Sequence, residues 1–360
     1  MGTRVEPHNI KENHRRLDIR QVIYLDIETY QDKVDSNTLL LPFRLAVAHS
    51  VKYDKDLNPH HVTTHTCREA HTLAHFISNI ANRNGRTYLV AHNAPFDIAA
   101  SYLLHYLQEL GFTINILRPD SGSMVITAKR KKQSLVLLDT LNFLDGSIES
   151  LGKIVGIEKL EVDFQTVDDE ALETYCKRDV EIMRTAFEQY LHFLKENDLG
   201  NFGLTISAQA FNAFRHRFMR HRIHIHNNLE AKRLERLAYG GGLTMPFAVG
   251  DFRGTKIYKT DVNSMYPKIM RDSPMPTRFI GFAPHPSIEQ LKEAIKYYAV
   301  IADVTLRPKT PFYRRRTQEG TIYPTYAFRT ALCTPEVKEA LKEDAILEVY
   351  QVALYQQDII

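Results

Sequence analysis

The segment Val22-Ile23-Tyr24-Leu25-Asp26-Ile27-Glu28 decides the predicted fold of the first half of the chain. Its first four residues are apolar and rich in strand-forming types, which predicts a buried strand that ends at the two acids. Because successive side chains of a strand point to opposite faces, Asp26 and Glu28 lie on the same face. The segment therefore predicts two neighbouring carboxylates at the end of a buried strand.

A second segment, Asn93-Ala-Pro-Phe-Asp97, brings a third carboxylate. The apolar run 88–91 precedes it, and a helical pattern over 97–110 follows and is closed by Gly111. A short apolar run followed by a helical pattern predicts a strand and then a helix. We therefore expect Asp97 at the junction between the two.

A third segment adds a carboxylate and a tyrosine. A helical pattern over 169–197 contains Tyr175 and Asp179, which lie four residues apart and so share one helix face. Four carboxylates that converge on one point repel each other strongly unless cations lie between them, and Mg²⁺ is the usual partner of such oxygens. The pattern therefore predicts a two-metal site suited to the hydrolysis of a phosphodiester.

In order and spacing, the three segments resemble the proofreading 3′-to-5′ exonuclease of family B DNA polymerases over residues 20–200. The resemblance implies an RNase H-like fold with two Mg²⁺ or Mn²⁺ ions at each exonuclease site. It implies that the metal ligands are Asp26, Glu28, Asp97 and Asp179, and that Tyr175 orients the attacking water. The positions it implies for contact with a single-stranded 3′ end of DNA are Thr29, Asn93, Phe96, Ser150, Leu151 and, as a catalytic-site lysine, Lys159.

Each motif has a simpler explanation when it is taken alone. An Asp-x-Glu after an apolar strand is more often a polar strand end, and the spacings Asn-x-x-x-Asp and Tyr-x-x-x-Asp are weaker signals. All three motifs occur in this order, each at the structural position that the chemistry requires, and this joint occurrence favours the catalytic interpretation.

A fourth segment points to a second activity. Lys256-Ile-Tyr-Lys-Thr-Asp261 is expected to be a strand that delivers an aspartate to a turn, and it resembles motif A of the family B polymerase palm. The resemblance implies that Asp261 binds the catalytic metals, that Ser264 holds the triphosphate and that Tyr266 excludes a 2′-hydroxyl. Upstream, Tyr239, Gly241 and Gly242 resemble the family's Tyr-x-Gly-Gly element. The resemblance implies that they contact template or primer DNA.

Two further motifs of a family B polymerase do not occur after Asp261 in this sequence. These are the lysine-containing helix motif for the incoming nucleotide and the Tyr-x-Asp-x-Asp strand for the second metal carboxylate. We therefore expect an incomplete polymerase centre and a C-terminal polymerase segment as a partner.

The predicted organisation is mixed α/β. An N-terminal extension covers 1–19, the RNase H-like 3′-5′ exonuclease domain 20–200, a helical connector with the glycine element 201–249, and a partial α+β polymerase palm 250–360. The short N-terminus resembles the viral and plasmid branch that includes protein-primed polymerases. The segment 320–341 resembles the insertion that binds a terminal protein in that branch. The resemblance implies replication of viral or plasmid DNA, with primer-template DNA and a terminal protein primer as partners.

A net charge of +3 is too small to indicate nucleic-acid binding, so the distribution of charge has to carry that argument. Two basic stretches, 215–222 and 307–316, are interleaved with aromatic residues, and Arg217 and Arg220 of the first are predicted to bind phosphate. The basic run 129–132 is expected at a hairpin tip and could also touch DNA. For each, a solvated surface remains the alternative.

The remaining composition fits an intracellular protein at a cytoplasmic or host-cell replication site. The 3 cysteines are scattered, which suggests a reducing compartment and no zinc site. No apolar run reaches the ~18 residues of a membrane span, and the N-terminus lacks the apolar core of a secretory signal. The 16 histidines form no strong metal motif.

Three hypotheses remain open. The first is the N-terminal portion of a family B DNA polymerase with a proofreading exonuclease. The second is a free-standing 3′-5′ exonuclease with a vestigial palm. The third is a catalytically inactive accessory that binds nucleic acid, which the four acids argue against, since carboxylates without metal repel phosphate.

Overall fold

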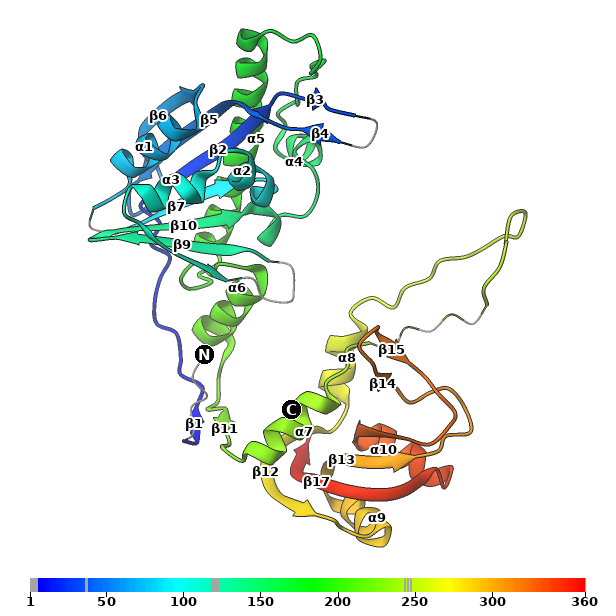
Figure 1. Ribbon diagram of the computed structural model, residues 1–360. Coiled ribbons are helices and arrows are strands. Elements are labelled where there is room, and N and C mark those ends of the chain that lie inside the picture. Colours follow the sequence, from blue (N-terminus) through cyan, green and yellow to red (C-terminus); the bar gives the residue numbers. More distant parts are fainter. Residues whose placement is uncertain are drawn as a thin grey trace. The chain divides into compact units, whose positions relative to one another are not determined.

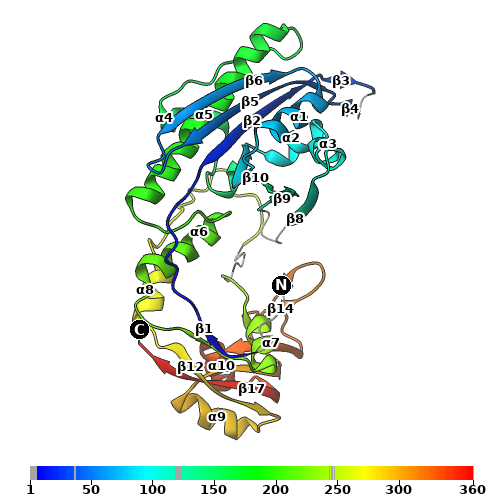
Figure 2. The same cartoon turned by 90° about the vertical axis from the view of Figure 1, so that its left-hand side faces the viewer.

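The computed structural model describes residues 6–35, 38–83, 85–117, 123–242, 244, 246 and 248–359. It forms two compact units, the larger made of Lys11–His221 and the smaller of Met1–Ile10 together with Arg222–Ile360 (Figures 1 and 2). The boundary falls inside the predicted connector, so 201–221 lie in the larger unit. The predicted N-terminal extension is likewise divided between the two units.

The larger unit is built on a seven-stranded mixed sheet in the order β6-β5-β2-β7-β10-β9-β8. β2 lies inside this sheet, antiparallel to β5 and parallel to β7, which is itself parallel to β10. The strands are β2 (Gln21–Thr29), β5 (Phe43–Tyr53), β6 (Pro59–Cys67), β7 (Arg86–Ala91), β8 (Thr113–Leu117), β9 (Val125–Arg130) and β10 (Gln133–Asp139). The strand predicted from residues 22–25 is confirmed as part of β2.

Helices cover both faces of this sheet and create two cores. Val22 and Tyr24 of β2 pack into one core with residues of α5, while Ile23 and Leu25 pack into the other with residues of α1 and α3. Both faces of β2 are buried, which explains why its sequence is continuously apolar rather than alternating. The helices and helical turns are α1 (Ala70–Ile80), α2 (Ala94–Ala100), α3 (Leu103–Glu109), η1 (Thr140–Asn142), α4 (Ile148–Val155), α5 (Asp169–Glu196), α6 (Ile206–Ala213) and η2 (Phe214–Phe218).

One helix prediction is confirmed and another needs correction. The pattern over 169–197 is α5, capped by Asp168, whose side chain accepts hydrogen bonds from the backbone of Glu170 and Ala171. The pattern over 97–110 is two helices, because Tyr102 takes a left-handed conformation (φ 50°) between α2 and α3. Hydrophobic periodicity does not report such a break, since both helices keep apolar faces on the same core.

The smaller unit has a four-stranded antiparallel sheet in the order β12-β17-β13-β16. Its strands are β12 (Met275–Pro284), β13 (Ala299–Leu306), β16 (Phe328–Cys333) and β17 (Ile346–Asp358), and its helices are α7 (Leu229–Ala238), α8 (Met265–Asp272), α9 (Ile288–Tyr297) and α10 (Thr334–Lys342). The two-stranded ribbons of the chain pair β1 (His8–Asn9) with β11 (His224–Ile225), β3 (Asp32–Lys33) with β4 (Leu39–Leu40), and β14 (Arg315–Arg316) with β15 (Thr321–Ile322). The first and third of these belong to the smaller unit.

The strand predicted to end at Asp261 is not formed. Residues 256–261 have no regular structure, and Asp261 is exposed. A strand needs a neighbour for its backbone N–H and C=O groups, and no described segment pairs with this one.

A helix that crosses a membrane must be long and apolar, and none of the described helices meets that requirement.

Candidate active site

Three elements of the larger unit bring four acids together. Asp26 and Glu28 lie near the end of β2, Asp97 lies in the first turn of α2 directly after β7, and Asp179 comes from the middle of α5. Each of the four interacts electrostatically with at least one other, and Asp26 interacts with all of the remaining three. The structure therefore brings the four acids near one another. Only Asp26 and Glu28 of the four, together with Cys176, have ligand atoms that all lie within 4.8 Å of one another among the described residues.

The acids are largely withdrawn from water and incompletely satisfied. Asp97 is only 2% exposed and Asp179 only 6%. One oxygen each of Asp26, Asp97 and Asp179 is buried and accepts no hydrogen bond from any described residue. Buried carboxylate oxygens without partners are costly unless they bind protons or a cation, so this group of atoms fits a metal site.

Burial and mutual repulsion both act on the protonation of these groups. Burial, followed by the charge of Asp179, raises the pKa of Asp26 to about 7. Burial, followed by the charges of Asp26 and Asp179, raises the pKa of Glu28 to about 8. The pKa of Asp97 is raised well above its usual range for the same reasons, burial first and then Asp26. Without a cation the cluster therefore holds protons near neutral pH.

One cation of the chain already lies at this cluster. Lys159 Nζ forms an ion pair with Asp179 Oδ2, and it lies 4.5 Å from the centre of the Tyr175 ring. Burial lowers the pKa of Lys159, but hydrogen bonds with Asp179 and Tyr175 outweigh burial and raise it. Burial raises the pKa of Asp179 despite Lys159. The structure thus brings together two residues, Lys159 and Tyr175, that the sequence predicted from separate motifs.

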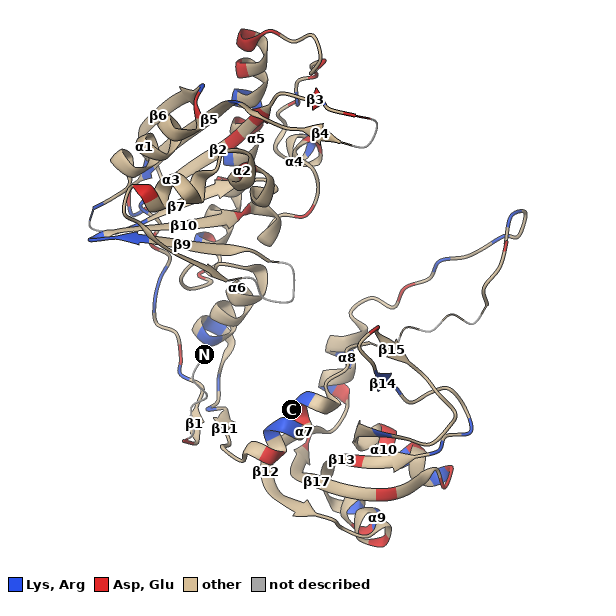
Figure 3. Ribbon diagram, viewed as in Figure 1, with Lys and Arg blue, Asp and Glu red and all other residues tan. Residues whose placement is uncertain are grey.

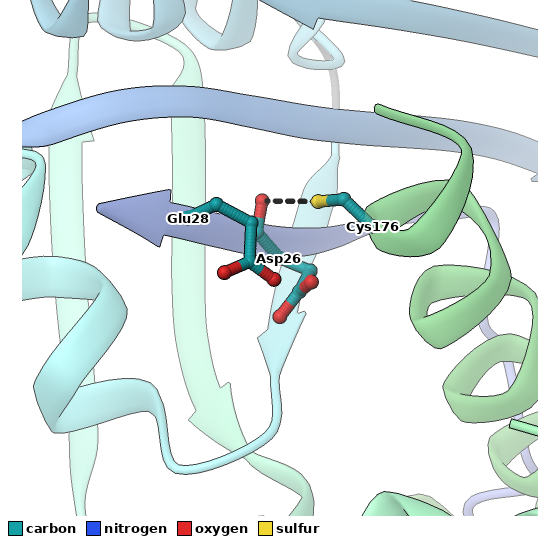
Figure 4. A group of neighbouring side chains, drawn as sticks. All are labelled: Asp26, Glu28 and Cys176. Carbon is teal, nitrogen blue, oxygen red and sulfur yellow. Dashed lines mark hydrogen bonds between the residues drawn. The ribbon is translucent and has the colours of Figure 1, made fainter. Parts of the chain in front are cut away.

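Two neighbours of the acids were not predicted as site residues. Cys176 is a further potential metal ligand. Its sulfur, one carboxylate oxygen of Asp26 and one of Glu28 all lie within 4.8 Å of one another. Figure 4 shows that the Cys176 sulfur approaches the backbone oxygen of Asp26, to which it donates a hydrogen bond of 3.5 Å. His92 shares a 2.7 Å hydrogen bond with Thr140, and burial lowers the pKa of its ring. Two features of the sequence could have indicated these neighbours. Cys176 lies three residues before Asp179 in the same predicted helix, and His92 directly follows the apolar run that forms β7.

No other group of this kind occurs in the described part of the chain. Asp26, Glu28 and Cys176 are the only set of three or more His, Cys, Asp or Glu ligand atoms that lie within 4.8 Å of one another there. Asp97, Asp179, Asp261 and the described histidines belong to no such set among those residues.

The residues predicted to contact a DNA strand fall into different environments. Asn93 has a left-handed backbone (φ 62°) before α2, and its N–H donates to Asp139 Oδ1 at 3.1 Å. Phe96 is 37% exposed in the first turn of α2, and Thr29 ends β2. These three therefore lie on the elements that carry the first three acids.

Ser150 and Leu151 lie together in α4 but point into different surroundings. Ser150 Oγ donates to Ser147 O at 2.7 Å and stays partly exposed. Leu151 is 3% exposed and packs in a small core with Ile182 of α5. The side chain of Leu151 is therefore a core group, and only its backbone remains for a ligand.

The two predicted phosphate-binding arginines differ from one another. Arg217 lies in η2 and donates a hydrogen bond to the backbone oxygen of Asn197, at the end of α5. Arg220 is exposed, and none of the described residues hydrogen bonds with it or pairs with its charge. Arg217 thus has a structural contact as well as the role predicted for it.

The predicted residues of the smaller unit are mostly exposed. Tyr239, which follows α7, is 78% exposed, and Tyr266 in the first turn of α8 is 59% exposed. A Cβ atom placed on Gly242 would lie 2.6 Å from the hydroxyl of Tyr266, so the glycine element and the motif A segment are in contact. The neighbouring Gly241 has φ +69°, a conformation that glycine adopts without strain. Ser264 takes a left-handed conformation just before α8, three residues after Asp261.

A test of the acidic cluster does not need catalysis. In the folded chain Asp26 and Glu28 hold protons that the unfolded chain has lost above about pH 4. The unfolding temperature of metal-free protein is therefore expected to fall as pH rises from that point through about 8, where Glu28 ionises. Above this window, Mg²⁺ at about a hundredfold excess over its Kd should raise the unfolding temperature by about 5 °C or more.

The variant Asp26→Asn should be more stable than the unchanged chain without metal at the upper end of this pH window, and should lose most of the response to Mg²⁺. Asp32→Asn is the matched control, since Asp32 is an exposed acid of β3 in the same unit and outside the cluster, and it should keep the full response. Calorimetry with and without Mg²⁺ checks both expectations. An Asp26→Asn variant that responds to Mg²⁺ as the unchanged chain does would contradict the assignment of the cluster as a metal site.

Comparison with solved structures identifies the fold. The chain is similar to phi29 DNA polymerase complexed with single-stranded DNA, with a TM-score of 0.63, 16% sequence identity and coverage of 94% of this chain. It is similar to the same polymerase in a binary complex with primer-template DNA, at TM-score 0.60, 15% identity and 94% coverage. The ternary complex with primer-template DNA and incoming nucleotide substrates gives TM-score 0.62, 15% identity and 95% coverage. The chain spans 61% to 62% of the length of the polymerase in these structures.

The family is defined by a sequence match. Residues 157–357 match the family model for DNA polymerase type B, organellar and viral. Because the match covers more than half of the 360 residues, the chain belongs to this family. The family predicted from the sequence motifs is therefore confirmed. No curated protein matches the chain in sequence.

Proposed function

We propose that the larger unit is an RNase H-like 3′-5′ exonuclease that uses two Mg²⁺ or Mn²⁺ ions and proofreads for a family B DNA polymerase. One observation carries this proposal, namely the buried carboxylate oxygens of Asp26, Asp97 and Asp179, which have no hydrogen-bond partner among the described residues. The mixed sheet with β2 between an antiparallel and a parallel neighbour supports the RNase H-like fold predicted for 20–200.

The residues of the cluster have different proposed roles in the reaction. Asp26, Glu28, Asp97 and Asp179 would hold the ions. Metal ions held there supply an activated water and stabilise the leaving 3′-oxygen. Tyr175 is fixed on α5 beside Lys159, which supports a role for its hydroxyl in orienting the water. Lys159 pairs with Asp179, which favours the ionised form of this carboxyl, and adds a positive charge where negative charge would develop.

Exposed groups near the acids suggest where a single DNA strand would bind. Phe96 offers an aromatic face to a terminal base, a contact worth ~1–3 kcal/mol. Thr29, Asn93 and Ser150, with the backbone of Leu151, would contact the 3′ end. Arg217 and Arg220 would bind phosphates further along the strand.

The direct test is degradation of a single strand labelled at its 5′ end. With Mg²⁺ or Mn²⁺, successive removal of nucleotides from the 3′ end should give a ladder of labelled products that shortens with time. A metal chelator should stop the reaction. Release of the labelled 5′ nucleotide as the first product would be the wrong polarity and would refute the proposal.

A second function is favoured by the contact between Gly242 and Tyr266. We infer that the smaller unit carries the first part of a polymerase palm, with Asp261 as a metal ligand, Ser264 and Tyr266 at the nucleotide, and Tyr239, Gly241 and Gly242 at primer-template DNA. The family match supports this role in replication of viral or plasmid DNA. A complementing C-terminal segment and a terminal protein primer are its proposed partners.

The two alternatives to a polymerase differ in what the smaller unit does. A free-standing exonuclease would show the same cleavage but would gain no synthesis from any added segment. A binding accessory without catalysis would have no use for acids whose burial raises their pKa. The exonuclease assay separates the accessory from the other two, and the complementation assay described in the Discussion separates those two from each other.

A further inference from the structure

A positively charged cavity lies in the larger unit, away from the acids. It has a volume of about 750 Å³, and the turn between β9 and β10 and the ends of α1 and α3 form its walls. Four basic residues line it, namely Arg83, Arg130, Lys131 and Lys132, and no Asp or Glu of the described chain does. We call this cavity the basic pocket. In Figure 3 the ribbon at the tip of the β9–β10 hairpin is blue, the colour of Lys and Arg.

The basic pocket is at the opposite end of the sheet from the acids. β7 runs from Arg86 to Ala91 and leads into the segment that carries Asp97, whereas the hairpin turn precedes β10, which is parallel to β7. The six residues of β7 span about 20 Å at ~3.3 Å per residue. The pocket is therefore separate from the candidate active site.

None of the four basic side chains has its charge neutralised by a described residue. Arg83, Lys131 and Lys132 are exposed and make no ion pair within the described part of the chain. Glu109 precedes the lining residue Leu110 in sequence but does not line the pocket, and its Oε1 lies 3.2 Å from His105 Nε2. The pocket thus concentrates positive charge without a protein counterion.

Arg130 forms a fixed wall of the pocket. Its guanidinium donates to Gln133 Oε1 at 2.7 and 3.1 Å and to Leu110 O at 2.9 Å, and it lies 4.6 Å from the centre of the Phe112 ring. Gln133 in turn donates to Ser78 O and Ala81 O at the end of α1. These bonds occupy carbonyl oxygens at the ends of α1 and α3, which would otherwise repel an anion.

The turn itself carries a backbone cost. Arg130 pairs with Gln133, so the hairpin has a two-residue turn, and its first residue, Lys131, has φ +50°. Glycine or asparagine is the usual choice for such a position, and a left-handed lysine costs about 1–2 kcal/mol. Backbone strain of this kind is often kept at ligand-binding segments, so it is consistent with a function for this turn.

We propose that the basic pocket binds backbone phosphates of a DNA strand and forms a second nucleic-acid contact on the larger unit. The chemistry it recognises is the phosphate anion, and the choice of a DNA strand as its source rests on the proposed function. A strand long enough to reach both ends of the sheet would contact the acids and the basic pocket together, whereas a trinucleotide at the acids would not reach the pocket.

The test uses the full chain and the double variant Lys131→Gln/Lys132→Gln, with Arg83→Gln as an independent second variant. Affinity for a long single strand is measured by fluorescence anisotropy in a chelator, across a series of salt concentrations. Removal of one phosphate-binding charge should reduce the slope of log K against log salt by about 0.7. The double variant should therefore bind about tenfold more weakly at low salt and show a flatter slope.

The matched control is Lys292→Gln/Lys338→Gln, which removes two exposed lysines, unpaired among the described residues, from helices of the smaller unit. It should change neither affinity nor slope. An unchanged slope and affinity in both pocket variants would overturn the proposal. Degradation of a trinucleotide with Mg²⁺ is followed in parallel and should be the same in all variants. Failure of the unchanged chain to degrade it would refute the exonuclease while leaving the binding result to decide on the pocket.

A final arm separates the two sources of phosphate. Calorimetric titration with inorganic pyrophosphate should show weak binding that the long strand displaces. The contrary result has two parts. Pyrophosphate would bind only when Lys131 and Lys132 are present, and the strand would neither displace it nor bind the variants more weakly. In that case the ligand is a free anion, and the proposed strand contact is refuted.

Discussion

Asp26→Asn and Asp97→Asn should each slow removal of 3′ nucleotides by about a thousandfold. Each change keeps the size of the side chain and removes one carboxylate from the cluster. A metal in such a site contributes several kcal/mol to transition-state stabilisation, and ~4 kcal/mol corresponds to about a thousandfold in rate. The rate is measured on a single strand labelled at its 5′ end, under conditions in which one enzyme molecule removes one nucleotide.

Two further variants sharpen this expectation. Tyr175→Phe keeps the ring that packs beside Lys159 and loses only the hydroxyl, so it should retain a measurable rate, well above that of Asp26→Asn. Asp261→Asn changes an exposed acid of the smaller unit and should leave the rate unchanged. Full activity of the double variant Asp26→Asn/Asp97→Asn would show that the cluster is not the catalytic site.

The purified chain of 360 residues should not extend a primer, although residues 256–261 resemble motif A of a polymerase palm. Nucleotidyl transfer needs metal ions held in register by several carboxylates. Asp261 is exposed on an irregular segment, and no set of ligand atoms within the described residues includes it. Template-directed incorporation should therefore be undetectable, and it is measured with Asp26→Asn/Asp97→Asn in place so that no product is removed.

Complementation supplies the positive half of this experiment. A separately produced C-terminal polymerase segment of the same family should restore synthesis in mixtures, and Asp261→Asn should abolish it. In that mixture Tyr266→Val should admit ribonucleotides by opening space at the 2′ position. Synthesis by the chain alone that disappears with Asp261→Asn would mean that its polymerase centre is complete and that the missing motifs were misread.

Local signals in the sequence were sufficient for the acidic cluster. The strand before Asp26 is apolar on both faces, and the helix that carries Tyr175 and Asp179 is long and well capped, so both elements follow from residues close in sequence. Convergence of their side chains was predicted from the resemblance to the family B exonuclease. The cluster was therefore predictable, although the structure adds the ion pair of Lys159 with Asp179 and the place of Cys176.

The parts that could not be predicted depend on distant or missing partners. The segment before Asp261 has the composition of a strand, but a strand forms only against a neighbour, and composition does not report whether one is present. The break at Tyr102 arises from one left-handed residue that leaves the apolar pattern intact. The basic pocket joins the ends of elements far apart in sequence, so only its hairpin tip could be foreseen.

The position of β2 between two cores links the site to the global stability of its unit. Val22 and Tyr24 belong to one core and Ile23 and Leu25 to the other, so this strand loses its surroundings only when both cores open. Its backbone amides then exchange hydrogen with solvent by complete unfolding rather than by local fraying. Asp26 and Glu28 follow the part of β2 that pairs on both sides, so we expect these two acids to keep their positions as long as the unit itself is folded.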